Sequence, residues 1–393
     1  MREKGEEPQK VLKNLAEIVE SDVRRFSYRA IGSMCPKPLL ISKIAYLMGM
    51  NGNVGDPGVW RGIAKLEEEV IKDLGGLLSN PRAVGAIVSS GSEANVIALW
   101  AARNYTKKRE IIVPSSCHIS IYKAADLLGL RVIRVPLNSD FTVDVDYVRR
   151  SITKNTAAIV GIAGTTALGV VDPIVELSEL AVERNVYLHV DAAFGGMVLP
   201  FLRDLGYTVP DFDFRLEGVQ SITVDPHKMG FVPIPAGGIL FKDPELVDSI
   251  TFRTPYLAGG NAKSFTIAGS RPGGSVTAVW TLLRVLGKEG YRNMISKCMK
   301  LTERLSKEIE NDGHLELLVK PVMNIVGIRA KNLSVKDFSR IVRGLGWFLS
   351  EFPTHLRVVL MPHHTEKLID ELIADLRRVA MSKGTELKVP LKA

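Results

Sequence analysis

The stretch VYLHVDAAFGG, residues 186–196, joins a short apolar strand to a carboxylate and then to a turn rich in alanine and glycine. Residues 186–190 are largely apolar on both alternating faces, as in strands that helices cover on both sides. Asp191 stands at the carboxyl end of this strand, the edge where parallel sheets place their binding sites. A carboxylate there needs a cation or hydrogen-bond donors, although a helix cap explains it equally well in isolation. His189 shares the face of Asp191, and we expect it to have a structural or supporting role.

Similar apolar runs recur before and after this strand, with helical periods between several of them. The expected strands are 84–89, 110–114, 131–135, 157–162, 186–190, 220–224 and 236–241, and the helical periods include 93–106, 119–128 and 175–184. Strands that alternate with helices in this way indicate βαβ units. The sequence therefore predicts an α/β fold whose large domain has a mostly parallel, seven-stranded sheet.

The rest of the chain divides into two smaller parts around this sheet. The first fifty residues form a segment that begins with a helix and ends in a turn-rich stretch, 49–58. Beyond the sheet, helices are expected at 275–286 and 291–311, followed by a smaller α+β unit with strands at 315–320, 324–330 and 356–361 and helices at 335–345 and 366–380. We therefore expect an N-terminal arm, 1–54, a large domain, 55–289, and a small C-terminal domain, 290–393.

The composition of the 393-residue chain, with 46% hydrophobic and 24% charged residues, is that of an ordinary globular protein. It argues against disordered, collagen-like and membrane classes. The charged beginning, MREKGEEPQK, lacks the apolar core of a signal peptide, and no run approaches the ~18 apolar residues of a spanning helix. The three cysteines, Cys35, Cys117 and Cys298, are far apart and suit a reducing compartment. We therefore expect a cytoplasmic protein.

The formal net charge of +8 makes a nucleic-acid partner one hypothesis. The densest basic run, 107–109, has neither interleaved aromatic residues nor the spacing of zinc ligands. A solvated basic surface explains the charge better, so we expect neither nucleic acid nor a membrane as a partner. Salt-dependent binding of tRNA would support the nucleic-acid hypothesis.

Several common chemical motifs are missing from the sequence. It has no Walker phosphate loop, GxGxxG fingerprint, CxxC pair, HExxH or GxSxG, and we expect no metal site. Gly91 and Ser92 instead follow the strand at 84–89 and open a helix, whose first N–H groups can bind a phosphate. Such a turn is more often only a turn, so this signal is weak by itself.

Two further strand ends carry polar residues. Lys228 follows the strand at 220–224, where desolvation and cationic neighbours would lower its pKa and allow a Schiff base, although most lysines are simply solvated. His118 follows the strand at 110–114. It is either a helix cap or a flat ring near the carboxyl edge of the sheet. A phosphate-binding turn, a flat ring, an acid (Asp191) and a lysine together match pyridoxal 5'-phosphate, which has a phosphate, a planar ring, a pyridine nitrogen and an aldehyde.

These motifs resemble those of the group II pyridoxal-phosphate-dependent amino-acid decarboxylases. The resemblance is carried by SSGSEAN (89–95), GIAGTTALGVVDP (161–173), HVDAAFGG (189–196) and VDPHKMGFVPIPAGGILF (224–241). GSMCPKPL (32–39), NVGDPG (53–58) and LRVVLMPH (356–363) are similar to the archaeal L-tyrosine/L-aspartate decarboxylases of that family. The resemblance implies a fold-type I pyridoxal-phosphate enzyme and, as is usual for that fold, a homodimer.

The resemblance also implies roles for individual residues. Lys228 would form the covalent link to the cofactor, Asp191 would pair with the pyridine nitrogen, and His118 would stack on the ring and contact the substrate carboxylate. Gly91, Ser92 and His227 would contact the phosphate, Thr166 would lie beside the cofactor, and Asp172 would organise the same loop. Arg357 and Arg271 are the candidates for substrate binding.

The implied activity is α-decarboxylation of an L-amino acid. L-Aspartate, giving β-alanine for the biosynthesis of coenzyme A or a related cofactor, is the substrate that we favour, with L-glutamate and L-tyrosine as further candidates. Animal members of the family protonate the product carbon with a tyrosine on a longer mobile loop. The matching stretch here, 256–270, is short and has Tyr256 as its only tyrosine, so the identity of the proton donor stays open. The alternatives are a carbon–carbon lyase of the sphingosine-phosphate lyase type and, from another class, an RNA-associated protein or a tRNA-dependent pyridoxal enzyme.

Overall fold

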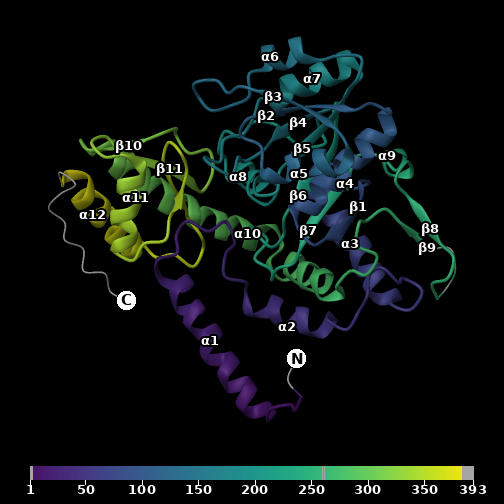
Figure 1. Cartoon of the computed structure of the whole chain (residues 1–393), viewed down its shortest axis with the longest axis horizontal. Helices are drawn as coiled ribbons and strands as arrows, with labels where there is room; N and C mark the ends of the chain where they lie inside the picture. Colours follow the sequence, from purple (N-terminus) through teal and green to yellow (C-terminus); the bar gives the residue numbers. More distant parts are fainter. Residues whose placement is uncertain (1–2, 259, 261, 383–393) are drawn as a thin grey trace.

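The large domain is built on a seven-stranded sheet (Figure 1). The structure is a computed structural model that describes residues 3–258, 260 and 262–382, without the side chains of 23–28. The strands are β1 (Val84–Val88), β2 (Glu110–Pro114), β3 (Arg131–Val135), β4 (Thr156–Ile162), β5 (Tyr187–Asp191), β6 (Val219–Val224) and β7 (Gly237–Phe241), in the order β1-β7-β6-β5-β4-β2-β3. Only β7 runs antiparallel to its neighbours. The prediction of a mostly parallel, seven-stranded sheet is confirmed.

Helices cover both faces of this sheet, which is why its strands are apolar on both sides. One face packs against α4 (Gly91–Thr106), α5 (Ile119–Leu128) and α9 (Glu245–Asp248). The other packs against α3 (Arg61–Leu77), α6 (Val145–Ser151), α7 (Ile174–Arg184), α8 (Leu199–Asp204) with the short 3-10 helix η1 (Gly195–Met197), and α10. Burial on both faces fixes the carboxyl ends of the strands relative to the helices that pack on the sheet.

A single long helix, α10 (Gly273–Glu310), leads from the large sheet to a second, smaller one. Gly287 has φ 53° and ψ −171°, so it separates the two helical halves that the sequence predicts at 275–286 and 291–311. The expected boundary between large and small domains, 289/290, falls just after it. The smaller sheet has the order β10-β11-β13-β12, from β10 (Leu315–Leu317), β11 (Ile325–Ala330), β12 (Ser350–Glu351) and β13 (Leu356–Val359), and it packs with α11 (Val335–Gly344) and α12 (Glu366–Met381).

The N-terminal segment touches both parts of the molecule. Helix α1 (Pro8–Arg29) extends away from the body, whereas α2 (Leu40–Gly49) packs along α10. Between them, Gly32 N–H donates to the carbonyl of Phe348 at 3.0 Å, and Val359 N–H donates to the carbonyl of Ile31 at 2.8 Å. The segment around 31–35 is thereby held against the small domain, next to the carboxyl edge of the large sheet.

A short antiparallel hairpin, β8 (Phe252–Thr254) and β9 (Ala262–Ser264), stands on the far side of the large domain. Tyr256 lies in the loop that joins the two strands and is 84% exposed. Among the described residues, no helix is both long enough and apolar enough to cross a membrane.

Candidate active site

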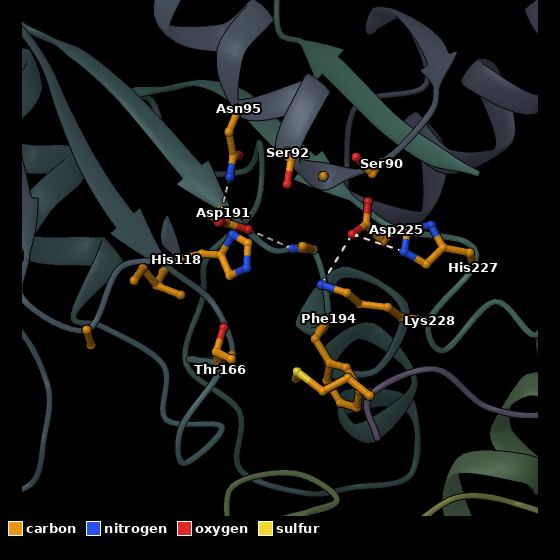
Figure 2. A pocket seen from close by; sticks show the side chains of 16 residues that line it. Ser90, Ser92, Asn95, His118, Thr166, Asp191, Phe194, Asp225, His227 and Lys228 are labelled. Carbon is orange, nitrogen blue, oxygen red and sulfur yellow. Dashed lines mark hydrogen bonds and ion pairs between the residues drawn. The ribbon is translucent and has the colours of Figure 1, made fainter. Parts of the chain in front are cut away.

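A pocket of about 200 Å³ lies at the carboxyl ends of β2, β4, β5 and β6, beside the first turn of α4 (Figure 2). Its described lining residues are Met34, Ser90, Gly91, Ser92, Asn95, Ser116, His118, Ile162, Gly164, Thr166, Asp191, Ala193, Phe194, Asp225, His227 and Lys228. Seven of the nine predicted site residues are among them; Arg357 and Arg271 are not. The strand-end argument therefore brings together side chains that are far apart in the sequence.

The first turn of α4 forms one wall of the pocket. The preceding residue, Ser90, makes no capping bond with its side chain, so the first N–H groups of the helix are open to a ligand. Gly91 is packed so closely that an added Cβ would lie 2.7 Å from Oδ2 of Asp225. A side chain here would therefore displace the carboxylate of Asp225, and Ser92 adds a hydroxyl beside Gly91. This wall is suited to a phosphate group.

Asp191 ends β5 and is 6% exposed. Its Oδ1 accepts a hydrogen bond from the backbone N–H of Ala193 at 3.1 Å, and its Oδ2 accepts one from the side-chain amide of Asn95 at 2.9 Å. These donors satisfy the requirement for burying a carboxylate and fix its direction, while leaving lone pairs free for a protonated ring nitrogen.

His118 is both a helix cap and a pocket residue. As the N-cap of α5, it accepts the backbone N–H of Ser120 on Nδ1 at 3.2 Å, and the Ser120 hydroxyl lies 2.9 Å from the same nitrogen. Partial burial lowers the pKa of His118, although the Asp191 carboxylate opposes this effect. The neutral ring is therefore favoured, with its proton on Nε2.

Lys228 reaches the pocket from the turn after β6. Its Nζ lies 3.2 Å from Oδ2 of Asp225, and Nε2 of His227 lies 3.7 Å from the same oxygen. Nδ1 of His227 donates to the carbonyl of Ala236 at 2.7 Å, which fixes the ring. The second oxygen of Asp225, Oδ1, is buried and has no hydrogen-bond partner among the described residues. The lysine is thus held in place by a carboxylate that retains free binding capacity.

The loop after β4 carries Thr166 and is fixed at both ends. Asp172 is fully buried and accepts the backbone N–H groups of Ile162 and Val143, each at 2.9 Å. Burial raises the pKa of Asp172 to about 7. From the small domain, Arg357 donates to the carbonyl of Thr166 at 2.5 Å and to the carbonyl of Gly32 at 2.7 Å.

Arg357 lies behind this loop and is 6% exposed. Its Nε is buried without a hydrogen-bond partner among the described residues, and burial lowers the pKa of its guanidinium to about 10. Its hydrogen bond to the carbonyl of Thr166, a residue of the pocket lining, places this arginine next to the pocket. It retains a donor for an anionic ligand.

Arg271 is placed differently. Its guanidinium forms an ion pair with the Glu67 carboxylate and donates to the carbonyl of Ile87 at 2.8 Å. These contacts tie the start of α10 to α3 and β1, outside the described pocket lining. The Nε of Arg271, like that of Arg357, is buried without a hydrogen-bond partner among the described residues, but the Glu67 carboxylate already neutralises its charge. A second carboxylate would therefore bind Arg271 less strongly than Arg357.

Sequence reasoning assigned no role to four polar residues of the pocket, namely Ser90, Asn95, Ser116 and Asp225. Asn95 and Asp225 stand inside quoted motifs, which was the available signal, but their contacts depend on the packing of several strands. Ser116 lies two residues before His118, and its buried hydroxyl has no hydrogen-bond partner among the described residues. Tyr256, the candidate proton donor, is exposed on the β8–β9 hairpin and does not line the described pocket.

The pocket fits pyridoxal 5'-phosphate in its shape and its donor set. The open turn at Gly91, the carboxylate of Asp191, the flat ring of His118 and the amine of Lys228 each face the same space. The unpartnered polar atoms of Ser116 and Asp225 line that space as well. Within the described part of the chain, no group of three or more His, Cys, Asp or Glu side chains could hold a metal ion.

Comparison with known proteins adds a family match. The family described as "Pyridoxal-dependent decarboxylase conserved domain" matches residues 3–331. The L-aspartate/L-glutamate decarboxylase of Pyrococcus horikoshii is 46% identical over 373 residues, covering 94% of this chain and 97% of that protein. The probable L-tyrosine/L-aspartate decarboxylase of Methanothermobacter thermautotrophicus is 45% identical over 363 residues, covering 90% and 98%.

Among solved structures, a sphingosine-1-phosphate lyase from Burkholderia pseudomallei superposes with a TM-score of 0.91 at 28% identity, covering 96% of this chain and 92% of that chain. The sphingosine-phosphate lyase alternative therefore shares the fold of this chain, whereas the sequence relatives are decarboxylases at much higher identity.

Proposed function

We propose that this chain, which belongs to the family of pyridoxal-dependent decarboxylases, is a pyridoxal-phosphate enzyme that converts L-aspartate into β-alanine and carbon dioxide. The observation that carries the proposal is the convergence of Lys228, Asp191, His118 and the first turn of α4 on one pocket. When bound, pyridoxal phosphate supplies an electron sink for the electron pair that remains on Cα as carbon dioxide leaves.

Each residue has a physical task in this proposal. Lys228 would hold the cofactor through a covalent bond that the amino group of the substrate can replace. Asp191 keeps a proton on the pyridine nitrogen, since an opposite charge raises such a pKa by ~1–3 units. Gly91, Ser92 and His227 hold the phosphate, and Thr166 lies beside the ring. His118 stacks on the ring and offers its Nε2–H to the substrate.

The proposed substrate rests on the relatives and on Arg357. Aspartate stands in the names of both relatives described above, one with glutamate and one with tyrosine. The free Nε of Arg357 behind the Thr166 loop can bind a carboxylate. L-Glutamate and L-tyrosine remain second choices, and we propose that β-alanine supplies the biosynthesis of coenzyme A or a related cofactor.

A substrate panel tests this proposal. Purified protein with pyridoxal phosphate is given L-aspartate, L-glutamate, L-tyrosine or a phosphorylated amino alcohol, and the products are identified by mass spectrometry. We expect carbon dioxide and β-alanine, with aspartate turned over fastest. Release of no carbon dioxide from any of the three amino acids would overturn the proposal, and an aldehyde from the phosphorylated compound would favour the lyase.

We also propose that the protein is a homodimer. One face of α1 exposes Val11, Leu12, Leu15, Ile18 and Val19, and one face of α2 exposes Leu40, Ile41, Ile44, Leu47 and Met48. Both sets have the spacing of an apolar helix face, and a second copy of the chain would cover them. We expect light scattering to give twice the chain mass, and the double substitution Leu15→Glu/Ile18→Glu to give monomers, unlike Lys13→Glu on the same helix.

We also propose a cytoplasmic location, because the three cysteines are all free.

The division into an N-terminal arm, a large domain and a small domain stays our proposal, with the boundaries given above.

A further inference from the structure

Asn95 binds four different side chains at the floor of the pocket. It lies on α4, one turn after Gly91, and is 1% exposed. Its Nδ2 donates to Oδ2 of Asp191 and to Oγ of Ser120, both at 2.9 Å. Its Oδ1 accepts from Oγ1 of Thr223 at 2.8 Å and from Nε2 of His189 at 3.0 Å. An asparagine amide has two donor and two acceptor positions, and all of them are used.

The chemistry of these partners determines which way the amide faces. An ionised carboxylate can only accept, so the nitrogen of Asn95 must face Asp191 and the oxygen must face Thr223 and His189. Nε2 of His189 then carries the ring proton, and Nδ1 of His189 accepts from the Ser221 hydroxyl at 2.8 Å. This agrees with a neutral ring, because burial lowers the pKa of His189 to about 4.

The same arrangement reaches His118 through Ser120. The Ser120 oxygen accepts from Asn95, which leaves its hydroxyl proton free to turn to Nδ1 of His118, 2.9 Å away. The backbone N–H of Ser120 points to that nitrogen as well. Nδ1 of His118 therefore acts only as an acceptor. The remaining nitrogen, Nε2, makes no hydrogen bond with any described residue and carries the ring proton.

We propose that Asn95 is a positioning residue that joins Asp191 and His118 in one hydrogen-bonded array, orienting both the carboxylate and the Ser120 hydroxyl that faces the imidazole. The proposal rests on the site assignment given under Proposed function. It goes beyond that assignment because it makes the ring-nitrogen partner and the ring-stacking group depend on one buried amide. Figure 2 shows Asn95 directed at Asp191, with His118 on the same side of the pocket.

A double-mutant cycle between Asn95 and Ser120 tests the array. Two quantities are measured. The first is the pKa of His118, determined by NMR of cofactor-free protein with labelled histidine rings, in which the His118 signal is assigned with His118→Gln. The second is the dissociation constant for pyridoxal phosphate. Asn104→Ala is the matched control, because Asn104 lies on the same helix and donates to the carbonyl of Ser249 instead. The charges that act on His118, namely Asp191, Asp225, Lys123 and Lys228, are unchanged in every variant.

We expect Asn95→Ala to raise the pKa of His118, because the Ser120 hydroxyl loses the bond that orients it and so stabilises the neutral ring less. Ser120→Ala should raise it by a similar amount, since the hydroxyl donor is lost, and the double variant should raise it no further. Asn95→Ala should also weaken cofactor binding at least tenfold through Asp191, whereas Ser120→Ala and Asn104→Ala should change it less than threefold.

Two results would overturn the inference: additive effects of the two substitutions on His118, or an Asn95→Ala protein that only melts earlier and binds the cofactor unchanged. If the alanine variant does not fold, Asn95→Asp keeps the size of the side chain. Its added charge should raise the pKa of His118 and weaken cofactor binding. If neither the pKa nor the dissociation constant changes, the proposal is refuted. A wild-type protein that binds no pyridoxal phosphate would refute the proposed function instead, and the His118 measurements would still test the array.

Discussion

The two halves of the pocket differ in how completely their polar groups are bonded. The carboxylate half consists of Asp191, Asn95, Ser120, His118 and His189, where the asparagine amide uses its full capacity and the buried carboxylate has two donors. The lysine half consists of Lys228, Asp225 and His227, where one oxygen of the buried Asp225 has no described partner. The first half is rigid before any ligand arrives, and the second retains capacity for one.

This difference matches the tasks that we propose for the two halves. A group that fixes the charge on a ring must not move during the reaction, because electrostatic stabilisation depends on dipoles that are oriented beforehand. A lysine that forms and releases a covalent bond must move, and a partly bonded neighbour allows it to do so. The predictions below test this contrast, beginning with the largest expected effect.

Removing the amine should have the largest effect. We expect Lys228→Ala to lower the rate of carbon dioxide release on the order of 10⁶-fold, the scale seen when a catalytic nucleophile is removed. Sodium borohydride followed by peptide mass spectrometry should find the cofactor bound to Lys228 in the wild type. Lys65→Ala, on the exposed side of α3, is the control and should be labelled normally. A covalent adduct that persists in Lys228→Ala would show that another residue holds the cofactor.

Neutralising the rigid half should have the next largest effect. Asp191→Asn keeps the size of the side chain and allows a bond with Asn95, but it removes the charge that faces the ring nitrogen. A loss of ~1–3 pKa units, about 1.4–4 kcal/mol, corresponds to a roughly 10- to 1,000-fold lower kcat. Steady-state kinetics with L-aspartate measure it. A kcat within threefold of the wild type would mean that Asp191 has no electrostatic role in catalysis.

The two arginines offer a smaller effect and a direct comparison. We expect Arg357→Gln to raise the KM for L-aspartate about 10- to 100-fold, because a hydrogen bond to a charged group contributes ~1.5–3 kcal/mol. Arg271→Gln breaks an ion pair with Glu67 outside the pocket, so it should lower the melting temperature and leave KM nearly unchanged. Equal changes in KM would contradict the placement of Arg357 beside the substrate.

The fold was predictable because burial on both faces gives each strand of the large sheet a continuous apolar run. Strands 110–114 and 131–135 have the predicted bounds, and the break in α10 at Gly287 separates two predicted helices. The shortest elements, such as α6, α8, β8, β9 and β12, were not predicted. They contain too few residues for a period to appear, and their conformation depends on the neighbours against which they pack.

The location of the pocket was predictable for a topological reason, since the carboxyl ends of parallel strands meet at one edge. The contacts within it were not. Asn95 binds residues on α5, β5 and β6, and no local pattern reveals which of them it faces. The two arginines look alike in the sequence, and only the packing of α3 against β1 shows that Glu67 neutralises Arg271.

The smallest expected effect concerns Asp172, a buried carboxylate outside the described pocket lining. Two backbone N–H groups hold it, whereas Asp191 has one backbone donor and one side-chain donor. Burial raises the pKa of Asp172 to about 7, above its usual value of 3.8, so the folded state binds more protons between these values. The free energy of unfolding should therefore fall as the pH rises from about 4 to about 7, by at most ~1.4 kcal/mol per pH unit from this group.

Asp172→Asn should be less stable, because one backbone N–H loses its acceptor, and its unfolding free energy should depend less on pH. Chemical unfolding at a series of pH values measures both slopes; parallel curves would mean that the two N–H donors keep Asp172 ionised in spite of its burial.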